Sequence, residues 1–202
     1  ATQPIRIYVG LKSAETAEDR AQIAVQELKR TGAFERPVLI LASTTGSGWL
    51  AEQSLSSIEY MYNGNTALVA QQYSYLPSWI SYLTDKSKAT EASQALYDAV
   101  FAEWSVLPRE TRPKLYAYGL SLGSFGGQTP YSGVNDLRLS IDGAFFEGTP
   151  NFTQLWRNTT DNRDEGSPEW QPTYRKGETV RFASTNSEIT ANQTAWSYPR
   201  IL

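Results

Sequence analysis

The spacing of apolar residues predicts alternating strands and helices along this chain. Apolar and β-branched runs predict strands at residues 5–10, 38–42, 66–73, 114–118 and 142–148. Helical spacing predicts one helix that starts after Ser13 and another at residues 89–106, and residues 51–62 are compatible with a shorter one. The run Val-Leu-Ile-Leu-Ala at 38–42 is typical of a parallel strand that is covered on both faces.

Polar and special residues mark the ends of these elements. Ser13 offers an N-cap for the first long helix, and Gly32 is placed to end it. Pro108 ends the second long helix. A loop of small residues at 43–49 follows the most apolar strand directly.

The order of the elements predicts an α/β fold with a mostly parallel, doubly wound sheet and helices on both faces. We expect one domain over residues 1–202. Residues 149–197 have weak periodicity and are predicted to be a lid or an excursion over the sheet, with some local structure. Residues 198–202 look like the opening of a strand that is cut off, so the C-terminal part of the sheet is predicted to be missing.

Composition narrows the classes of function. Of the 202 residues, 40% are hydrophobic and 19% charged, as in a globular domain. A net charge of −3 provides no basic footprint for nucleic acid. The absence of cysteine excludes disulfides, thiolate catalysis and Cys-ligated metals, and we predict no metal and no cofactor.

The clearest chemical motif is Gly-Leu-Ser-Leu-Gly at residues 119–123. It follows a predicted strand and precedes the small residues 124–127, which is the context of a nucleophile elbow. Such a turn lifts the Ser121 hydroxyl above the sheet and aims the N–H group of Leu122 at a developing oxyanion. The alternative is an ordinary turn rich in Gly and Ser.

A second oxyanion donor is expected from a loop after an earlier strand. Thr45 and Gly46 are the first choice, and the loop at residues 10–13 is a close second. Aromatic residues near these loops would suit a substrate pocket, or else they pack a core or lid: Trp49, Tyr75, Trp79 and Phe125.

A serine nucleophile needs a general base, and this chain contains no histidine. Its lysines show no spacing typical of a Ser–Lys pair. The acidic candidates for a triad are Asp142, Glu147, Asp161 and Asp164, and for Glu147 a place on the rim or in a salt bridge is favoured over a catalytic one. None of these acids completes a triad without a histidine.

Six motifs together resemble the catalytic domain of a bacterial α/β-hydrolase family whose full-length members carry a membrane-embedded N-terminal region. The resemblance covers nearly the whole chain and rests on residues 6–14, 45–49, 72–79, 118–127, 150–152 and 166–170. The aromatic motif Gln-Tyr-Ser-Tyr-Leu-Pro-Ser-Trp at 72–79 is more specific than the elbow. Leu120 departs from the family, in which we expect an acidic residue in many members.

The resemblance implies hydrolysis of a carboxylic ester, in a small molecule or a lipid, by a Ser-Asp-His triad with Ser121 as the nucleophile. It places the acid and the histidine in a segment beyond the strand that begins near Ile201. It also implies a membrane-associated bacterial protein with a soluble catalytic domain. The competing hypothesis is a non-catalytic α/β domain that serves binding or assembly.

Overall fold

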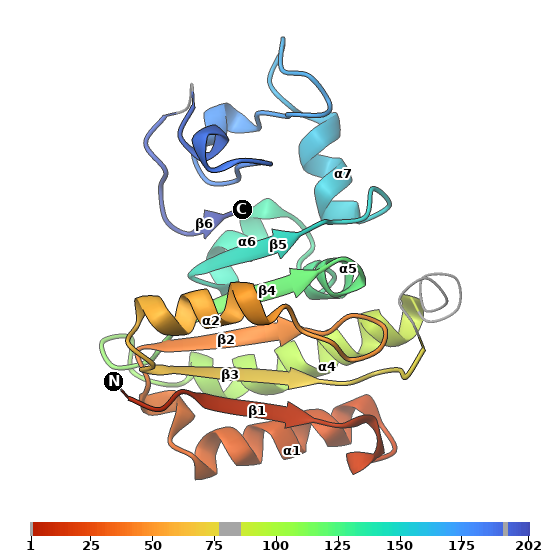
Figure 1. Cartoon of the computed structure of the whole chain (residues 1–202), viewed down its shortest axis with the longest axis vertical. Coiled ribbons are helices and arrows are strands. Elements are labelled where there is room, and N and C mark those ends of the chain that lie inside the picture. The colour runs from red at the N-terminus through yellow and green to blue at the C-terminus, as the bar shows by residue number, and fades with distance from the viewer. Residues whose placement is uncertain (1, 77–85, 192–193) are drawn as a thin grey trace.

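A computed structural model describes residues 2–76, 86–191 and 194–202 of the chain. Its centre is a six-stranded sheet in the order β1-β3-β2-β4-β5-β6, and every neighbouring pair is parallel (Figure 1). The strands are β1 (Ile5–Val9), β2 (Val38–Ser43), β3 (Thr66–Gln71), β4 (Lys114–Leu120), β5 (Gly143–Glu147) and β6 (Arg200–Ile201). The predicted mostly parallel, doubly wound sheet is therefore confirmed.

The central strand β2 shows why the sheet forms a middle layer. Side chains of successive residues point to opposite faces, and both sets in β2 are apolar. Val38 and Ile40 belong to the core on one face, whereas Leu39 and Leu41 belong to the core on the other. All four are buried. A strand of this composition needs cover on both sides, as its sequence predicts.

Helices cover both faces of the sheet, with more of them on one face than on the other. One face carries α1 (Ala17–Arg30), α4 (Lys86–Ser105) and α5 (Leu122–Gln128), which pack side by side in this order. The opposite face carries α2 (Glu52–Met61), as Figure 1 shows. The connections β1 to β2 and β3 to β4 each pass over one strand in the same direction, but β2 to β3 steps back. Because such crossovers are right-handed, the backward step places α2 on the other face.

The ends of α1 correct one prediction and agree with another. Its N-cap is Thr16, whose hydroxyl accepts a hydrogen bond from the Asp19 N–H group at 3.0 Å. Ser13 lies instead in a short 3-10 turn, Leu11–Ser13. Both residue types cap helices well, and Thr16 stands directly before the acidic first turn. Gly32 follows the helix in the left-handed region at φ 70°, as expected of a residue that ends one.

Residues 149–191 lie beyond the β5–β6 edge of the sheet in Figure 1. They contain α7 (Gln154–Asp161) and two 3-10 turns, Arg175–Gly177 and Asn186–Ile189. The short α6 (Val134–Ser140), which the sequence pattern did not predict, precedes β5. No helix among the described residues is long and apolar enough to cross a membrane.

The buried side chain of Arg181 organises this last region. Its guanidinium group donates to the carbonyl oxygens of Gly177 at 2.8 Å and Ile189 at 2.5 Å, and also to that of Thr194. Burial lowers the pKa of Arg181, and the nearby Arg200 lowers it further. The segment next to it pairs with β6, because Val180 forms a parallel bridge with Ile201.

Candidate functional site

The turn at Ser121 has the backbone of a strained elbow. Ser121 joins β4 to α5 with φ 55° and ψ −121°, a conformation that non-glycine residues rarely adopt. Strain of this kind persists where the surroundings impose it, and it gathers at functional sites. The serine hydroxyl makes no capping hydrogen bond to α5, although serine is a preferred N-cap residue. The hydroxyl is therefore not used as a cap of α5.

The two glycines of the motif are required by close packing. A Cβ atom at Gly123 would lie 2.3 Å from the carbonyl oxygen of Ser43 and 2.9 Å from that of Thr44. A Cβ atom at Gly119 would lie 2.4 Å from the carbonyl oxygen of Gly123. All of these neighbours are backbone atoms, which cannot turn aside. The glycines thus let the first turn of α5 press against the end of β2.

This packing brings the loop after β2 next to the elbow. The loop is the preferred source of a second oxyanion donor, whereas the alternative loop follows β1 at the outer edge of the sheet. The N–H group of Thr45 donates to the carbonyl oxygen of Trp49 at 3.0 Å and is already engaged. Within the described residues, the N–H groups of Gly46 and Leu122 make no hydrogen bond. The N–H groups of Gly46 and Leu122 thus have no acceptor among the described residues, whereas that of Thr45 has one.

Two side chains hold the shape of this loop. The hydroxyl of Tyr8 donates to the carbonyl oxygen of Gly48 at 2.8 Å, and the amide of Gln72 donates to that of Ser47 at 3.3 Å. Burial raises the pKa of Tyr8, with a smaller contribution from Tyr75, so Tyr8 stays a neutral donor. The loop is thereby fixed from β1 and from the end of β3.

The predicted pocket aromatics have different surroundings. Trp49 and Tyr75 are 52% and 56% exposed, so they form an open rim and no closed pocket. Phe125 lies in α5 with its ring 5.1 Å from that of Phe152, in a cluster that also contains Leu122. Trp79 lies outside the described residues.

Three of the four acidic candidates are occupied by structural contacts. Asp142 accepts hydrogen bonds from the Leu115 N–H group at 2.9 Å and from Lys114 at 3.2 Å, at the end of β4 opposite the elbow. Asp164 accepts two backbone N–H groups, those of Arg175 at 2.9 Å and Lys176 at 2.6 Å. Glu147 is hydrogen-bonded to two hydroxyl groups.

The partners of Glu147 lie on the α2 side of the sheet. Its carboxylate accepts the Ser54 hydroxyl at 2.6 Å and the Tyr118 hydroxyl at 2.8 Å. Burial and the hydrogen bond to Glu147 raise the pKa of Tyr118 well above its ordinary value, so the phenol keeps its proton. The fourth candidate, Asp161, is exposed at the end of α7. Of the four candidates, three are thus engaged in structural contacts and the fourth is exposed.

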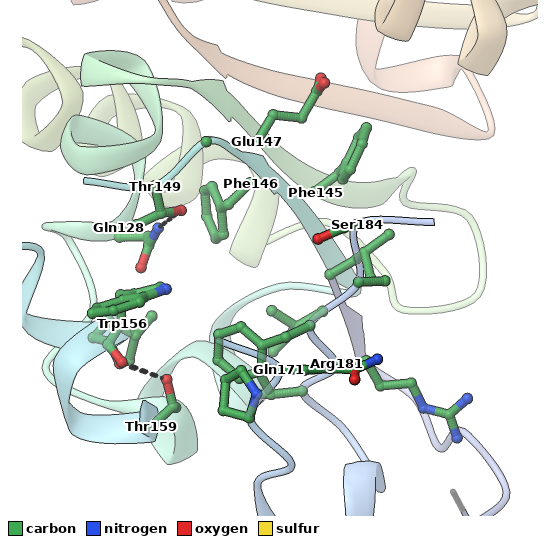
Figure 2. A pocket seen from close by; sticks show the side chains of 18 of the residues that line it. Gln128, Phe145, Phe146, Glu147, Thr149, Trp156, Thr159, Gln171, Arg181 and Ser184 are labelled. Atoms are coloured by element: carbon green, nitrogen blue, oxygen red, sulfur yellow. Dashed lines mark hydrogen bonds between the residues drawn. The ribbon is translucent and has the colours of Figure 1, made fainter. Parts of the chain in front are cut away.

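A cavity of about 480 Å³ lies beside the elbow at the β5–β6 edge. Figure 2 shows Phe146 and Trp156 on its walls, with Gln128 hydrogen-bonded to Thr149 at its upper rim and Glu147 directed away from it. Among the described residues, Ser121 does not line this cavity, and neither do the predicted aromatics Trp49, Tyr75 and Phe125. In the part of the chain that the structure describes, no group of three His, Cys, Asp or Glu side chains is placed to hold a metal ion.

Comparison with known proteins places this arrangement in a family. A model described as "Alpha/beta-hydrolase family" matches residues 5–202, which is nearly the whole chain. The chain belongs to the alpha/beta-hydrolase family. No curated protein and no solved structure matches it. Because the match runs through the elbow, the strained serine of this hydrolase-family member lies within the part that defines the family.

Sequence reasoning located the elbow of this alpha/beta-hydrolase family member but missed the residues that surround it. Tyr118, Ser54 and Thr149 read as ordinary strand, helix and loop positions. Only the place of Glu147 at the end of a predicted strand signalled that its side chain would lie near the elbow, because parallel strands end at one edge.

Proposed function

We propose that this protein is a serine hydrolase that cleaves a carboxylic ester through an acyl-enzyme on Ser121. The observation that carries the proposal is the backbone of Ser121, which is strained at φ 55° in a turn that two tightly packed glycines make possible. Its hydroxyl is not used as a helix cap. A non-glycine residue is costly in this conformation, and we infer that serine is kept here because it acts as a nucleophile.

The chemistry assigns a separate role to each group at the sheet edge. The Ser121 Oγ atom attacks the ester carbonyl carbon while a general base takes its proton. The carbonyl oxygen becomes an oxyanion, to which the N–H groups of Leu122 and Gly46 donate. The intermediate collapses, the C–O bond breaks, and the alcohol leaves with the proton from the base. Water then attacks the acyl-enzyme by the same route, which releases the acid and restores Ser121.

We propose that the base and the acid of the triad come from polypeptide beyond residue 202, as a histidine and an aspartate. The 202 residues contain no histidine, and the acidic candidates Glu147, Asp142 and Asp164 are engaged in structural contacts. The cavity at the β5–β6 edge supports the location of this segment. Phe146, Phe182 and Leu202 line it, and Leu202 pairs with β5, so a segment that follows Leu202 would start at the wall of this cavity.

The open rim favours an ester with an aromatic or acyl group that stays partly in solvent. Trp49 and Tyr75 are exposed aromatic residues in the segments that follow β2 and β3. Phe125 and Phe152 add a partly buried surface on the α5 side. An ester of a small molecule and an ester of a lipid both fit these surroundings. Attachment to a membrane would require an N-terminal region outside these 202 residues.

The second candidate is a non-catalytic domain for binding or assembly. The observation in its favour is the absence of histidine from the 202 residues. Against it stands the cost of a strained serine that the fold does not use as a cap.

Labelling with a serine-reactive phosphonate separates the two candidates. We expect a full-length form of the protein to be labelled at Ser121, and the Ser121→Ala variant to lose both the label and turnover of a p-nitrophenyl ester. Ser132→Ala is the matched control, because Ser132 is an exposed serine in the loop before α6. A full-length protein that is not labelled at Ser121 would exclude the enzyme. Turnover through Ser121 by residues 1–202 alone would exclude the external base.

A further inference from the structure

We infer that the turn at residues 147–149 is a positioning element that holds the strained backbone of Ser121 through two separate side-chain networks. As a statement about catalysis the inference rests on the proposed function. As a statement about the elbow it stands on the hydrogen bonds around the turn. Neither network includes a residue that would touch the substrate, so these are positioning residues.

The turn reaches the elbow through the backbone. The N–H group of Ser121 donates to the carbonyl oxygen of Glu147 at 2.9 Å, which extends the ladder between β4 and β5 by one bond. Ser121 is therefore held between this bond and the helical bond from Phe125 N–H to the Ser121 carbonyl oxygen at 3.1 Å. A movement of the Glu147 carbonyl oxygen would therefore lengthen or break the bond that holds the Ser121 N–H group.

The first network fixes Glu147 from the α2 face. Its carboxylate receives the Tyr118 hydroxyl from β4 and the Ser54 hydroxyl from α2. Tyr118 is 1% exposed, and its ring packs 6.0 Å from that of Phe145. A hydroxyl this deeply buried that donates to a carboxylate makes a strong, directional bond. The end of β5 is thus tied to the strand that carries the elbow.

The second network fixes Thr149 from the α5 face. The hydroxyls of Ser124 and Thr149 are 2.5 Å apart, and the amide of Gln128 donates to both, at 3.0 Å and 3.1 Å. Ser124 is fully buried and Gln128 is 5% exposed. Figure 2 shows the Gln128–Thr149 contact at the rim of the cavity. The first turns of α5 and the turn after β5 therefore move as one unit.

Together the networks hold the turn on both sides of the sheet. A strained residue needs surroundings that over-determine its conformation, and one backbone hydrogen bond does not provide that. The side-chain contacts on the α2 and α5 faces provide the rest. The alternative is that both networks only stabilise the fold. In that case, removing any buried hydroxyl should change hydrogen exchange of the Ser121 amide to the same extent.

The experiment uses two variants that remove one hydroxyl each, Tyr118→Phe and Thr149→Val, in the full-length protein. Two matched controls remove hydroxyls that are also buried but make no hydrogen bond within the described residues, Tyr131→Phe and Thr153→Val. The first readout is hydrogen exchange of the Ser121 amide, which requires no activity. We expect exchange to accelerate about tenfold in each test variant, the factor that one net hydrogen bond is worth. The controls should exchange like the wild type.

The second readout is catalytic and depends on the proposed function. We expect kcat and the phosphonate labelling rate to fall about tenfold in Tyr118→Phe and Thr149→Val, because displaced nucleophiles react slowly. KM should stay within about twofold, since no group that binds substrate is removed. Glu147→Gln, which keeps an acceptor for both hydroxyls, should retain more activity than Glu147→Ala.

The outcomes distinguish the two claims. Wild-type exchange at Ser121 in both test variants overturns the positioning element, whether or not the protein is labelled. Faster exchange at Ser121 that the controls share would also overturn it, because that result is a general loss of stability. Faster exchange in the test variants alone, in a protein that is never labelled, supports the element and refutes the esterase.

Discussion

Replacing Gly123 with alanine tests whether packing of the elbow against β2 sets the position of the nucleophile. The new Cβ atom would lie 2.3 Å from the Ser43 carbonyl oxygen, whereas real contacts of this kind do not fall below 3.0 Å. Subtracting 2.3 Å from 3.0 Å, α5 must move away from β2 by at least about 0.7 Å. Overpacking costs about 1–3 kcal/mol, and the better helix propensity of alanine returns about 1 kcal/mol. We expect a net loss of up to about 2 kcal/mol.

The assay pairs denaturant unfolding with phosphonate labelling of Ser121. A nucleophile displaced by part of an ångström should react about tenfold to a hundredfold more slowly. Gly133→Ala is the control, because a Cβ atom there meets nothing within 4 Å and φ is 175°, extended backbone that alanine adopts. If Gly123→Ala unfolds and reacts like the wild type, the close approach to Ser43 does not hold the elbow, and our reasoning is wrong.

Two further predictions concern stability. Arg181→Met should cost at least about 2 kcal/mol, because it leaves the buried carbonyl oxygen of Gly177 and two partly buried ones without this donor. Hydrogen exchange should rise first in residues 176–191, and a uniform change over the whole chain would contradict this. Burial raises the pKa of Tyr118, and it raises the pKa of Tyr131 well above the ordinary value. At high pH the folded protein therefore keeps protons that the unfolded chain releases. Stability should therefore be full below about pH 10, the ordinary tyrosine pKa, and decrease as the pH rises above it. Tyr118→Phe should flatten that decrease in denaturant midpoints measured from about pH 8 to pH 11.

The central strands β2 and β3 could be predicted because they are largely apolar on both faces. β2 and β3 read as continuous apolar runs, and such runs are compatible with few other environments. The short α6 was missed, because seven residues between a turn and a strand contain too few helical periods to be recognised. The cap at Thr16 was missed because Ser13 offers the same chemistry three residues earlier.

The candidate site divides in the same way. The elbow could be predicted because glycine and serine at fixed spacing have a mechanical cause within the motif. Thr45 was a reasonable choice for an oxyanion donor, but its bond to the Trp49 carbonyl oxygen depends on how the loop folds back. Glu147 contacts Ser54, which is 93 positions away in the sequence, and Tyr118, which is 29 positions away. No local pattern in a single sequence encodes contacts over such separations.

The pairing of residues 179–181 with β6 affects how copies of this protein meet. Arg181 N–H donates to the Ile201 carbonyl oxygen at 2.9 Å, and Ile201 N–H to that of Thr179 at 3.1 Å. The chain thereby occupies hydrogen-bonding groups that a strand from another molecule would use. At the other end of the sheet β1 is the outermost strand. Edge-to-edge association, and any aggregation that begins from the folded state, should therefore start at β1.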